Sequence, residues 1–299
     1  MFIAFSFVGK LPSYIVECIH QTRLFFQGDI YLIINDLSSD YLSKIEKYNI
    51  NIVNYEDVKH EDFDVLLQET YSKFFILHGL TGREELFIRS IERFFLLSNL
   101  MKKRNLSDCL FLELDNLIYD NPEKWINSFS KKELSYMIFN DTSASSGLMF
   151  IKNSNSLDTL LSYFIDYVKA SNDRFITEMI ALYRYMNDTI QIIPTYWEKN
   201  DIKMLENQNF GDYGDSIFDA LGIGMYLLGM DIFHTNGKLE VGKKNPWGGI
   251  DYSLDIFEWK EENGLKIPYI YTGEKWLKIN NLHVHSKDLK SGISKSMEE

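Results

Sequence analysis

The chain of 299 residues carries 31 basic and 43 acidic side chains, which give it a formal net charge of −12. Proteins that coat nucleic-acid duplexes need a basic surplus to neutralise phosphates, so the sequence argues against that class. Hydrophobic residues make up 45% of the chain and charged residues 25%, proportions that fit a folded globular protein and not a disordered one.

The two cysteines, Cys18 and Cys109, lie far apart in the sequence. They form neither a disulfide framework nor a Cys-x-x-Cys metal site, so we expect reduced thiols. The apolar segment from Met1 to Val8 has no basic residues ahead of it, and Lys10 and Pro12 follow at once, which indicates a buried strand and not a signal peptide. No apolar run reaches the roughly 18 to 20 residues that cross a bilayer.

Short apolar runs alternate with helical periods at the start of the chain. We expect strands over Phe2 to Phe7, Asp29 to Ile34 and Ile50 to Asn54, and helices over Ser13 to Phe25 and Ser39 to Tyr48. This βαβαβ order predicts a parallel sheet with helices on both faces. Such sheets bind ligands at the carboxyl ends of their strands.

The later part of the chain alternates helices and strands before it becomes rich in loops. We expect helices over Glu84 to about Lys103, Ser156 to Ala170 and Arg174 to Met186, strands over Cys109 to Leu112 and Ser146 to Ile151, a loop-rich stretch from Asn200 to Trp276, an extended segment from Ile279 to His285, and a frayed polar end from about Ser291. No internal repeat or low-complexity linker divides the chain, which favours one continuous domain.

The strongest local signal is Glu113-Leu114-Asp115, which follows the strand expected from Cys109 to Leu112. Residues i and i+2 of an extended segment point to the same side, so both carboxylates would leave the edge of the sheet on one face. Two carboxylates there can hold Mn²⁺ or Mg²⁺, which in turn neutralises a diphosphate. A turn or a helix cap is the simpler interpretation of an acidic pair taken alone.

A second signal is His283-Val284-His285-Ser286-Lys287, near the end of the chain. If this segment is extended, His283, His285 and Lys287 share one face and place two imidazoles and an ammonium in a row. The end of a solvent-facing strand is the alternative interpretation. The two signals support each other, because carboxylates, imidazoles and an ammonium together match the needs of a metal-bound diphosphate.

Two glycine-rich motifs are weaker signals. Gly222-Ile223-Gly224 lacks both the third glycine and the preceding strand of a dinucleotide-binding fingerprint. Gly79-Leu80-Thr81-Gly82-Arg83 lacks the Lys-Ser/Thr ending of a P-loop. The sequence also contains no Gly-x-Ser-x-Gly elbow and no His-Glu-x-x-His motif, so it offers no support for those hydrolase classes.

Four charged residues have an ordinary structural interpretation beside a functional one. Arg89 and Arg93 lie one turn apart on the helix that precedes the acidic pair, and surface ion pairs with Glu85 and Glu92 suit Arg89 better than Arg93. Glu178 near the start of a helix is favoured by the helix dipole alone. Asp219 fits a capping or solvated residue.

Several runs together carry a family resemblance. They are Glu92-Arg93-Phe94-Phe95, Phe111-Leu112-Glu113-Leu114-Asp115-Asn116-Leu117-Ile118-Tyr119, Ser146-Gly147-Leu148-Met149-Phe150-Ile151-Lys152-Asn153, Ile217-Phe218-Asp219-Ala220, Tyr226-Leu227-Leu228-Gly229 and Asn281-Leu282-His283-Val284-His285-Ser286-Lys287. In this order the set resembles GT-A-fold nucleotide-sugar glycosyltransferases, most of all the domain that acts on the capsid glycans of chloroviruses and its bacterial relatives. The resemblance covers nearly the whole chain. It implies a single α/β domain with a mixed, mostly parallel central sheet flanked by helices.

The resemblance also implies a metal site. Glu113-Leu114-Asp115 matches the DxD-type motif of the family, with Asp115 as a direct metal ligand and Glu113 as a second ligand or a ribose contact. The first position is Glu where the family motif has Asp, so the role of Glu113 is the less defined. His285, ahead of His283, would complete the site from the end of the chain. The implied cofactor is Mn²⁺ or Mg²⁺.

Other positions would bind the nucleotide. Lys287 would contact the phosphates and Arg93 would lie against the nucleotide, while Ser6 and Gly9 at the end of the first strand and Tyr55 after the third would frame the base. The implied substrates are a nucleoside-diphosphate sugar as donor and a hydroxyl of a glycan or glycoconjugate as acceptor.

The implied reaction is transfer of the sugar to that hydroxyl, with the metal and Lys287 stabilising the departing nucleoside diphosphate. An inverting enzyme needs a carboxylate base for the attacking hydroxyl. Glu178 is the first candidate for that base and Asp219 the second. In a retaining enzyme neither assignment holds in this form, and the sequence leaves both stereochemical outcomes open.

Two other classes of function stay open. One is a metal-dependent hydrolase of phosphoesters or nucleotide sugars, and the other is a non-catalytic carbohydrate-binding relative. The βαβαβ start and the single acidic pair favour the transferase, because such hydrolases usually gather more metal ligands.

For the organisation of the chain, we expect a glycosyltransferase-like domain over residues 1–290, with residues 1–115 as its nucleotide-binding half and 116–290 as its acceptor-binding half, followed by a polar tail over 291–299. The expected location is the cytoplasm, that of the host if the source is viral, with peripheral membrane contact left open. No nucleic-acid partner is expected. Tyr196, Trp197, Tyr213 and Trp247 lie where an acceptor sugar could stack, although core packing is the simpler role.

Overall fold

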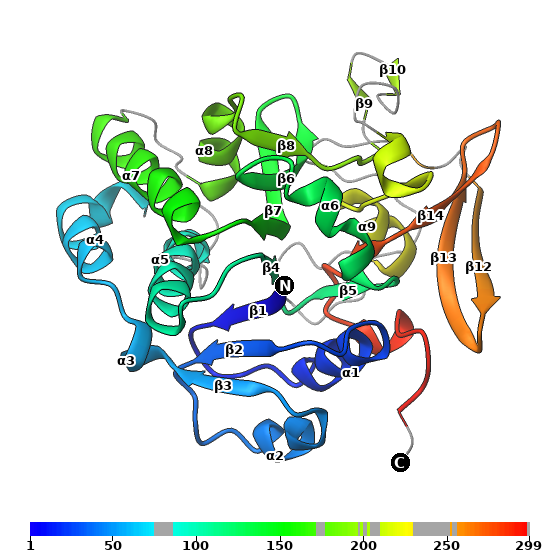
Figure 1. The fold of residues 1–299 in the computed structure, drawn as a ribbon, viewed down its shortest axis with the longest axis horizontal. Helices are drawn as coiled ribbons and strands as arrows, with labels where there is room; N and C mark the ends of the chain where they lie inside the picture. The colour runs from blue at the N-terminus through cyan, green and yellow to red at the C-terminus, as the bar shows by residue number, and fades with distance from the viewer. Residues whose placement is uncertain are drawn as a thin grey trace.

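The computed structural model describes residues 1–74, 86–171, 177–196, 198–199, 202–203, 210–229, 252 and 256–297. Its centre is a seven-stranded sheet with the strand order β3-β2-β1-β4-β7-β6-β8 (Figure 1). These strands are β1 (Phe2–Phe7), β2 (Ile30–Ile34), β3 (Asn51–Asn54), β4 (Cys109–Leu112), β6 (Leu134–Asn140), β7 (Ser143–Ile151) and β8 (Ile190–Ile192). Neighbours pair in parallel, except that β7 is antiparallel to both β4 and β6. The chain is therefore a mixed α/β protein with a mostly parallel sheet, as predicted.

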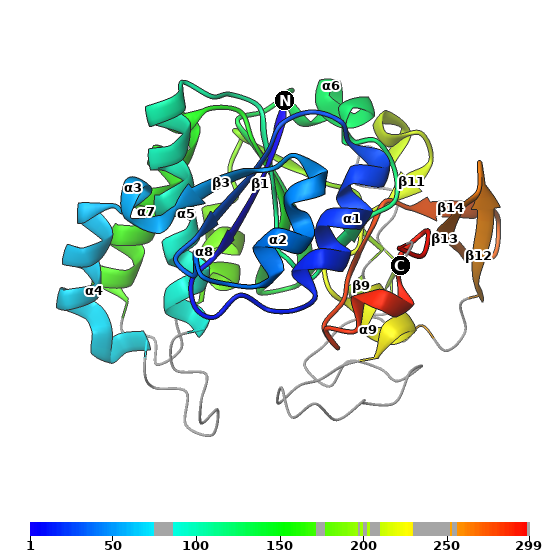
Figure 2. The same ribbon diagram turned by 90° about the horizontal axis from the view of Figure 1, so that it is seen from below.

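Helices cover the sheet on both sides (Figure 2). The α-helices are α1 (Ile15–Phe25), α2 (Tyr41–Ile45), α3 (Tyr55–Val58), α4 (Glu61–Phe74), α5 (Leu86–Arg104), α6 (Ile126–Phe129), α7 (Ser154–Ala170), α8 (Glu178–Tyr185) and α9 (Gly222–Leu228). Short 3-10 helices are η1 (Glu46–Tyr48), η2 (Pro122–Trp125), η3 (Phe210–Tyr213) and η5 (Leu289–Ser291). In Figure 2, α1 and α2 lie on one side of the sheet and α5 and α7 on the other. Among the described residues, no helix has the length and apolar character that crossing a bilayer requires.

The two faces of β1 show why its first four residues, Phe2 to Phe5, are all apolar. Ile3 and Phe5 join one buried cluster, which contains residues of α1, while Phe2 and Ala4 join a second cluster, which contains residues of α5 and α7. A strand buried on both faces has no polar side, so its sequence is a continuous apolar run. The same alternation divides β4 between the two clusters, with Leu110 on one face.

Smaller sheets extend the fold beyond the central one. The strands β11 (Ser216–Ile217), β14 (Trp276–Ile279), β13 (Leu265–Tyr271) and β12 (Ile256–Glu262) form a four-stranded sheet in that order, and β5 (Asn116–Ile118) pairs with β15 (Asn281–His283). A further hairpin joins β9 (Glu198–Lys199) to β10 (Ile202–Lys203). The four-stranded sheet lies at the right in Figures 1 and 2, away from α5 and α7.

The predicted elements of the first half are confirmed, with changes in detail. β1 and β4 have the predicted bounds, whereas the helix expected from Ser39 to Tyr48 consists of α2 followed by η1. The stretch expected to be rich in loops, Asn200 to Trp276, contains α9 and the hairpin of β12 and β13, so that prediction is wrong there. Strand β12 carries little apolar signal, because it is the edge strand of its sheet and most of its side chains are exposed or half-buried.

The segment expected to fray from about Ser291 is held in the structure, and that prediction is wrong for Ile293 and Ser294. Both are buried. Ser294 accepts a hydrogen bond on its hydroxyl from the Gln21 amide at 2.8 Å and donates its backbone N–H to the Gln21 amide oxygen at 2.8 Å. Helix α1 therefore binds the end of the chain through buried polar contacts.

The aromatic residues named in the loop-rich stretch divide into two groups. Tyr196 and Tyr213 are buried members of the core cluster that α1 covers, which confirms the simpler interpretation. The Tyr213 ring lies 5.5 Å from that of Phe218, edge to face. Trp197 and Trp247 lie outside the described residues, as does the Gly79 to Arg83 motif.

Candidate metal centre

A turn at the end of β4 presents the acidic pair. The N–H of Glu113 donates to the carbonyl of Gly147 at 2.9 Å and so continues the ladder between β4 and β7. The chain then turns, because the N–H of Asn116 donates to the carbonyl of Glu113 at 3.0 Å. The sequence analysis assumed that the segment from Glu113 to Asp115 is extended, and the structure shows that it is not. The two carboxylates approach the same point because the chain turns between them.

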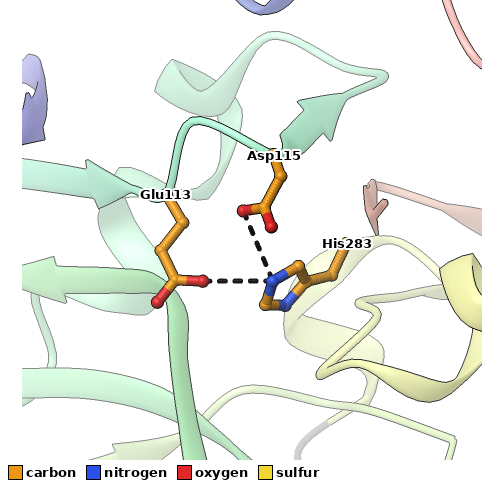
Figure 3. Close-up of side chains that lie close together, drawn as sticks. All are labelled: Glu113, Asp115 and His283. Atoms are coloured by element: carbon orange, nitrogen blue, oxygen red, sulfur yellow. Dashed lines mark ion pairs between the residues drawn. The ribbon is translucent and has the colours of Figure 1, made fainter. Parts of the chain in front are cut away.

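The pairing of β5 with β15 brings the end of the chain to this turn. His283 lies opposite Asn116 in the antiparallel register, and the N–H of Val284 donates to the carbonyl of Asp115 at 2.7 Å. His283 Nε2 lies 3.0 Å from Glu113 Oε2 and 3.4 Å from Asp115 Oδ1 (Figure 3). The imidazole of one segment thus points between the two carboxylates of the other.

These three side chains form a set that fits a divalent cation. Glu113, Asp115 and His283 each offer one ligand atom, and these atoms lie within 4.8 Å of one another. Carboxylate oxygens suit Mg²⁺ and Mn²⁺, and an imidazole nitrogen is accepted by Mn²⁺ and other transition metals. The set therefore supports the expected metal site.

The structure groups His283, and not His285, with the carboxylates. The family resemblance gave His285 first place, and an extended segment would have put both histidines on one face, but β15 ends at His283. The chain then turns, with the N–H of Lys287 donating to the carbonyl of Val284 at 3.0 Å. Side chains beyond His283 therefore no longer alternate as they would on a strand.

Two cationic side chains occupy the other carboxylate oxygens of the acidic pair. Arg93 Nη1 donates to Glu113 Oε1, and Lys287 Nζ donates to Asp115 Oδ2. The oxygens that face His283 are Glu113 Oε2 and Asp115 Oδ1. Each carboxylate thus pairs with a fixed cation on one oxygen and turns the other toward the imidazole.

This charge pattern sets the protonation of the cluster. Burial alone would raise the pKa of Glu113, but Arg93 and His283 outweigh it and lower the pKa to about 2. Burial would lower the pKa of His283, but Asp115 and Glu113 raise it to about 10. In the absence of a metal ion, the cluster therefore consists of two carboxylates that are held by positively charged side chains. A metal would bind the neutral imidazole and so would replace the proton on His283.

Arg93 binds the acidic pair from a buried position. The guanidinium Nη2 donates to Ser146 Oγ at 2.7 Å and lies 3.4 Å from Glu178 Oε1. The Arg93 side chain is only 10% exposed, and Phe94 and Phe111 lie beside the guanidinium, each ring centroid 5.2 Å away. The expected contact of Arg93 with the nucleotide stays a prediction, and in the structure its guanidinium binds Glu113, Ser146 and Glu178.

Glu178 lies at the other end of this buried network. It is the first residue of α8 and is buried, with Ser90 Oγ donating to Oε2 at 2.6 Å. Burial raises the pKa of Glu178, although Arg93 and Ser90 oppose the shift. A carboxylate whose pKa is raised in this way binds a proton more readily than one in water.

Asp219 has the structural role that the sequence analysis offered as the alternative. Its carboxylate accepts hydrogen bonds from the N–H groups of Ile223 at 2.9 Å, Gly224 at 2.7 Å and His283 at 2.9 Å. It therefore caps the start of α9 and ties that helix to β15. Asp219 is 1% exposed, so it does not reach an attacking hydroxyl as it stands.

The residues expected around the nucleobase lie on the carboxyl edge of the sheet. Ser6 is the half-buried penultimate residue of β1, and Gly9 donates its N–H to Asn35 Oδ1 at 2.8 Å just after β2. Tyr55 follows β3 and donates its hydroxyl to Glu92 Oε1 at 2.8 Å. Arg89 binds the other oxygen of Glu92 at 2.7 Å, which confirms the predicted ion pair.

Four residues support the cluster although the sequence analysis assigned no role to any of them. Ser90 and Ser146 bind Glu178 and Arg93, and Asn281 joins Asn116 to Asp219 through bonds of 2.8 and 3.0 Å. The remaining one, Gly147, lies inside β7, and a Cβ there would meet His283 Nδ1 at 2.9 Å. A glycine inside an apolar strand was the one available signal, because it marks a close approach by another group.

No family model and no curated protein matches the sequence. Solved structures with a similar course of the backbone include the apo form of mouse xyloside xylosyltransferase 1, at 10% identity and a TM-score of 0.42, over 64% of this chain and 84% of that one. Another is the glycosyltransferase GlyE of Streptococcus pneumoniae, at 11% identity and a TM-score of 0.44, over 64% of this chain but only 45% of GlyE. The PaToxG glycosyltransferase matches at 12% identity and a TM-score of 0.38, over 62% of this chain and 69% of that one. Likeness at this level concerns the fold and does not extend to residues or substrates.

Proposed function

We propose that this chain is a divalent-metal-dependent glycosyltransferase that moves a sugar from a nucleoside-diphosphate sugar to a hydroxyl of a glycan or glycoconjugate. The observation that carries the proposal is the convergence of Glu113, Asp115 and His283 just beyond the carboxyl end of β4. Ligands of open α/β sheets bind at that edge. The family resemblance of the sequence points to the same chemistry. The narrower resemblance to the chlorovirus enzymes stays a prediction.

In this proposal Asp115 and Glu113 hold the cation through the oxygens that face His283, and His283 completes the ligand set. A cation bound there supplies a Lewis acid for the diphosphate of the donor. Arg93 keeps Glu113 in place, since it is bound at once to Glu113, Ser146 and Glu178. Asp115 is held by the hydrogen bond between its carbonyl and the N–H of Val284, and Glu113 is held by the buried guanidinium of Arg93.

We assign the general base to Glu178 for an inverting reaction. A carboxylate with a raised pKa is suited to exchange protons near neutral pH. To act in this way, Glu178 must exchange its contact with Ser90 for the acceptor hydroxyl. Asp219 is no longer proposed as a base, because its carboxylate is used by three backbone N–H groups.

We still propose that Ser6, Gly9 and Tyr55 contact the nucleobase of the donor, because they lie at the carboxyl edge of the sheet. The division into a nucleotide-binding half over residues 1–115 and an acceptor-binding half over 116–290 also stays a prediction. The acidic pair lies at the boundary of the two halves.

The proposal is tested by thermal unfolding with Mn²⁺ and a nucleoside diphosphate. We expect Mn²⁺ with UDP, GDP or dTDP to raise the melting temperature by at least about 2 °C at saturating ligand, since ligand binding stabilises the folded state by mass action. Asp115→Asn should abolish the rise. Asp120→Asn is the matched control, because Asp120 pairs with Lys124 outside the cluster and its loss should leave the rise intact. No stabilisation by any of the three diphosphates with Mn²⁺ would contradict the proposal.

A further inference from the structure

Arg93 and Lys287, the two positively charged side chains that bind the acidic pair, differ in their freedom to move. Arg93 is bound to Glu113, Ser146 and Glu178, and its side chain is 10% exposed. The Lys287 side chain is 25% exposed, and Asp115 is the one acceptor of its ammonium among the described residues. Lys287 lies on the turn after β15, where no strand pairing holds it. Lys287 can therefore leave its carboxylate without breaking any other described side-chain bond, whereas Arg93 cannot.

The position of the Lys287 ammonium conflicts with a cation in the cluster. Lys287 binds Asp115 Oδ2, while Asp115 Oδ1 faces His283 Nε2 at 3.4 Å. A divalent cation that used Oδ1 would share one carboxylate with the ammonium, and the two positive charges would repel each other over a few ångströms in a mostly buried place. The ion pair and the metal therefore compete for Asp115.

We propose that Lys287 is a removable counter-ion of Asp115, which a divalent cation displaces, and that the displaced ammonium then serves the diphosphate. The first step depends only on the metal site. The second step rests on the proposed function, because it needs an anionic donor. Without metal, Lys287 neutralises Asp115; with metal, the same charge becomes available to phosphate oxygens.

The exchange couples the two ligands. The apparent affinity for the cation is reduced by the fraction of molecules in which Asp115 is paired with Lys287. A diphosphate that binds the released ammonium holds Lys287 away from Asp115 and so strengthens cation binding, and by reciprocity the cation strengthens diphosphate binding by the same factor. The positive charge needed for an anionic substrate is then exposed only when the metal is bound.

The test is a calorimetric titration with MnCl₂ alone at neutral pH. We expect Lys287→Met to bind Mn²⁺ on the order of tenfold more tightly than the wild type, because the variant has no ion pair to break. Met keeps the unbranched apolar stem of the side chain without its ammonium, and the φ of 63° at this position strains both residues alike. Lys287→Arg, which keeps the charge, should bind Mn²⁺ like the wild type.

Lys290→Met is the matched control for charge removal in general. Lys290 is exposed on η5, three residues further along the chain, and its loss should change Mn²⁺ affinity by less than about twofold. Unchanged or weaker Mn²⁺ binding in Lys287→Met would overturn the proposal, as would equal tightening in Lys290→Met. Absence of Mn²⁺ binding from both the wild type and Lys287→Met would also overturn it.

A second titration, with UDP, GDP or dTDP at saturating Mn²⁺, examines the later step. We expect Lys287→Met to bind the diphosphate more weakly than the wild type at saturating Mn²⁺, because the variant lacks the released ammonium and keeps only the direct contribution of the metal. Tighter Mn²⁺ binding without any diphosphate binding would support the displacement and contradict the proposed function. Diphosphate binding with equal Mn²⁺ affinity in both proteins would support the proposed function and overturn the displacement.

Discussion

At the scale of single residues, Glu178 is a carboxylate in surroundings that oppose its charge. Burial raises its pKa, and the contacts with Arg93 and Ser90 reverse only part of that shift. An acid with a raised folded pKa binds protons more tightly when folded than when unfolded. The contribution of Glu178 to the free energy of unfolding therefore falls as the pH rises above 4.5, the ordinary pKa of a glutamate side chain.

Glu178→Gln should remove this dependence. We expect the free energy of unfolding of the variant, minus that of the wild type, to increase as the pH rises from about 4.5 to 7. Denaturant unfolding across this pH range measures the difference, from which the other titrating groups cancel. A flat difference would mean that Glu178 is not destabilised as a carboxylate.

The same variant also tests the proposal that Glu178 is the general base. Glu178→Gln should keep the stabilisation by Mn²⁺ and nucleoside diphosphate but lower the rate of transfer by about a hundredfold or more, the usual contribution of a general base. The wild-type rate in the variant would move the base elsewhere or indicate a retaining reaction.

At the scale of elements, the close contact of α9 with β15 holds the histidine in place. Gly224 lies in the first turn of α9, and a Cβ there would meet the carbonyl oxygen of His283 at 2.2 Å and Asp219 Oδ2 at 2.9 Å. The motif Gly222-Ile223-Gly224 therefore serves helix packing, which agrees with the absence of a dinucleotide fingerprint. Only glycine lets the helix approach this strand so closely.

Gly224→Ala should destabilise the fold by about 2 to 4 kcal/mol, since a backbone carbonyl and not a flexible side chain must move. The displacement of His283 should also weaken Mn²⁺ binding in the molecules that remain folded. Denaturant unfolding and a Mn²⁺ titration measure the two effects. Gly211→Ala is the control, because no heavy atom lies within 4 Å of a Cβ there. Equal stability of the two variants would contradict the packing argument.

At the scale of the whole molecule, α1 near the start of the chain binds the segment after η5 near its end. Gln21 is fully buried and donates its amide to the carbonyl of Ile118 at 2.7 Å and to Ser294 Oγ at 2.8 Å. Its amide oxygen accepts the N–H of Ser294 at 2.8 Å. This one side chain joins the first helix, β5 and the segment after η5, and β5 is the strand that aligns β15 beside the acidic pair.

Gln21→Leu should therefore cost about 1 to 3 kcal/mol, because Ser294 and the Ile118 carbonyl lose their buried partner. We expect faster amide hydrogen exchange over residues 289–295 and weaker Mn²⁺ binding. Gln27→Leu, at an exposed position two residues beyond the end of α1, should leave both unchanged. Unaltered exchange at Ser294 in Gln21→Leu would show that other contacts hold the segment.

The net charge of −12 also belongs to this scale. An acidic protein that binds a nucleotide sugar must provide local positive charge, and the sequence offers Arg93 and Lys287 near the acidic pair. In the structure both are already paired with carboxylates. Under the proposed function, a bound cation and the release of Lys287 supply positive charge for the substrate at the acidic pair.

The sequence by itself determined five strands of the central sheet, β1 to β4 and β7, and the place of the acidic pair, whereas β6 and β8 were not predicted. Continuous apolar runs predict strands buried on both faces, and the residues directly after β4 must lie at its carboxyl end, because both inferences depend only on neighbours in the chain. The metal function of Glu113 and Asp115 could be proposed at that stage because two carboxylates separated by one residue suffice to suggest it.

Only the tertiary structure decided which residues join the pair. Asp115 and Lys287 are 172 residues apart in the sequence, and Arg93 and Glu178 are 85 apart. Their contacts depend on the register of β15 against β5 and on the packing of α8 near α5, which no local pattern encodes. The same register selected His283 over His285 and turned Asp219 from a candidate base into the cap of α9.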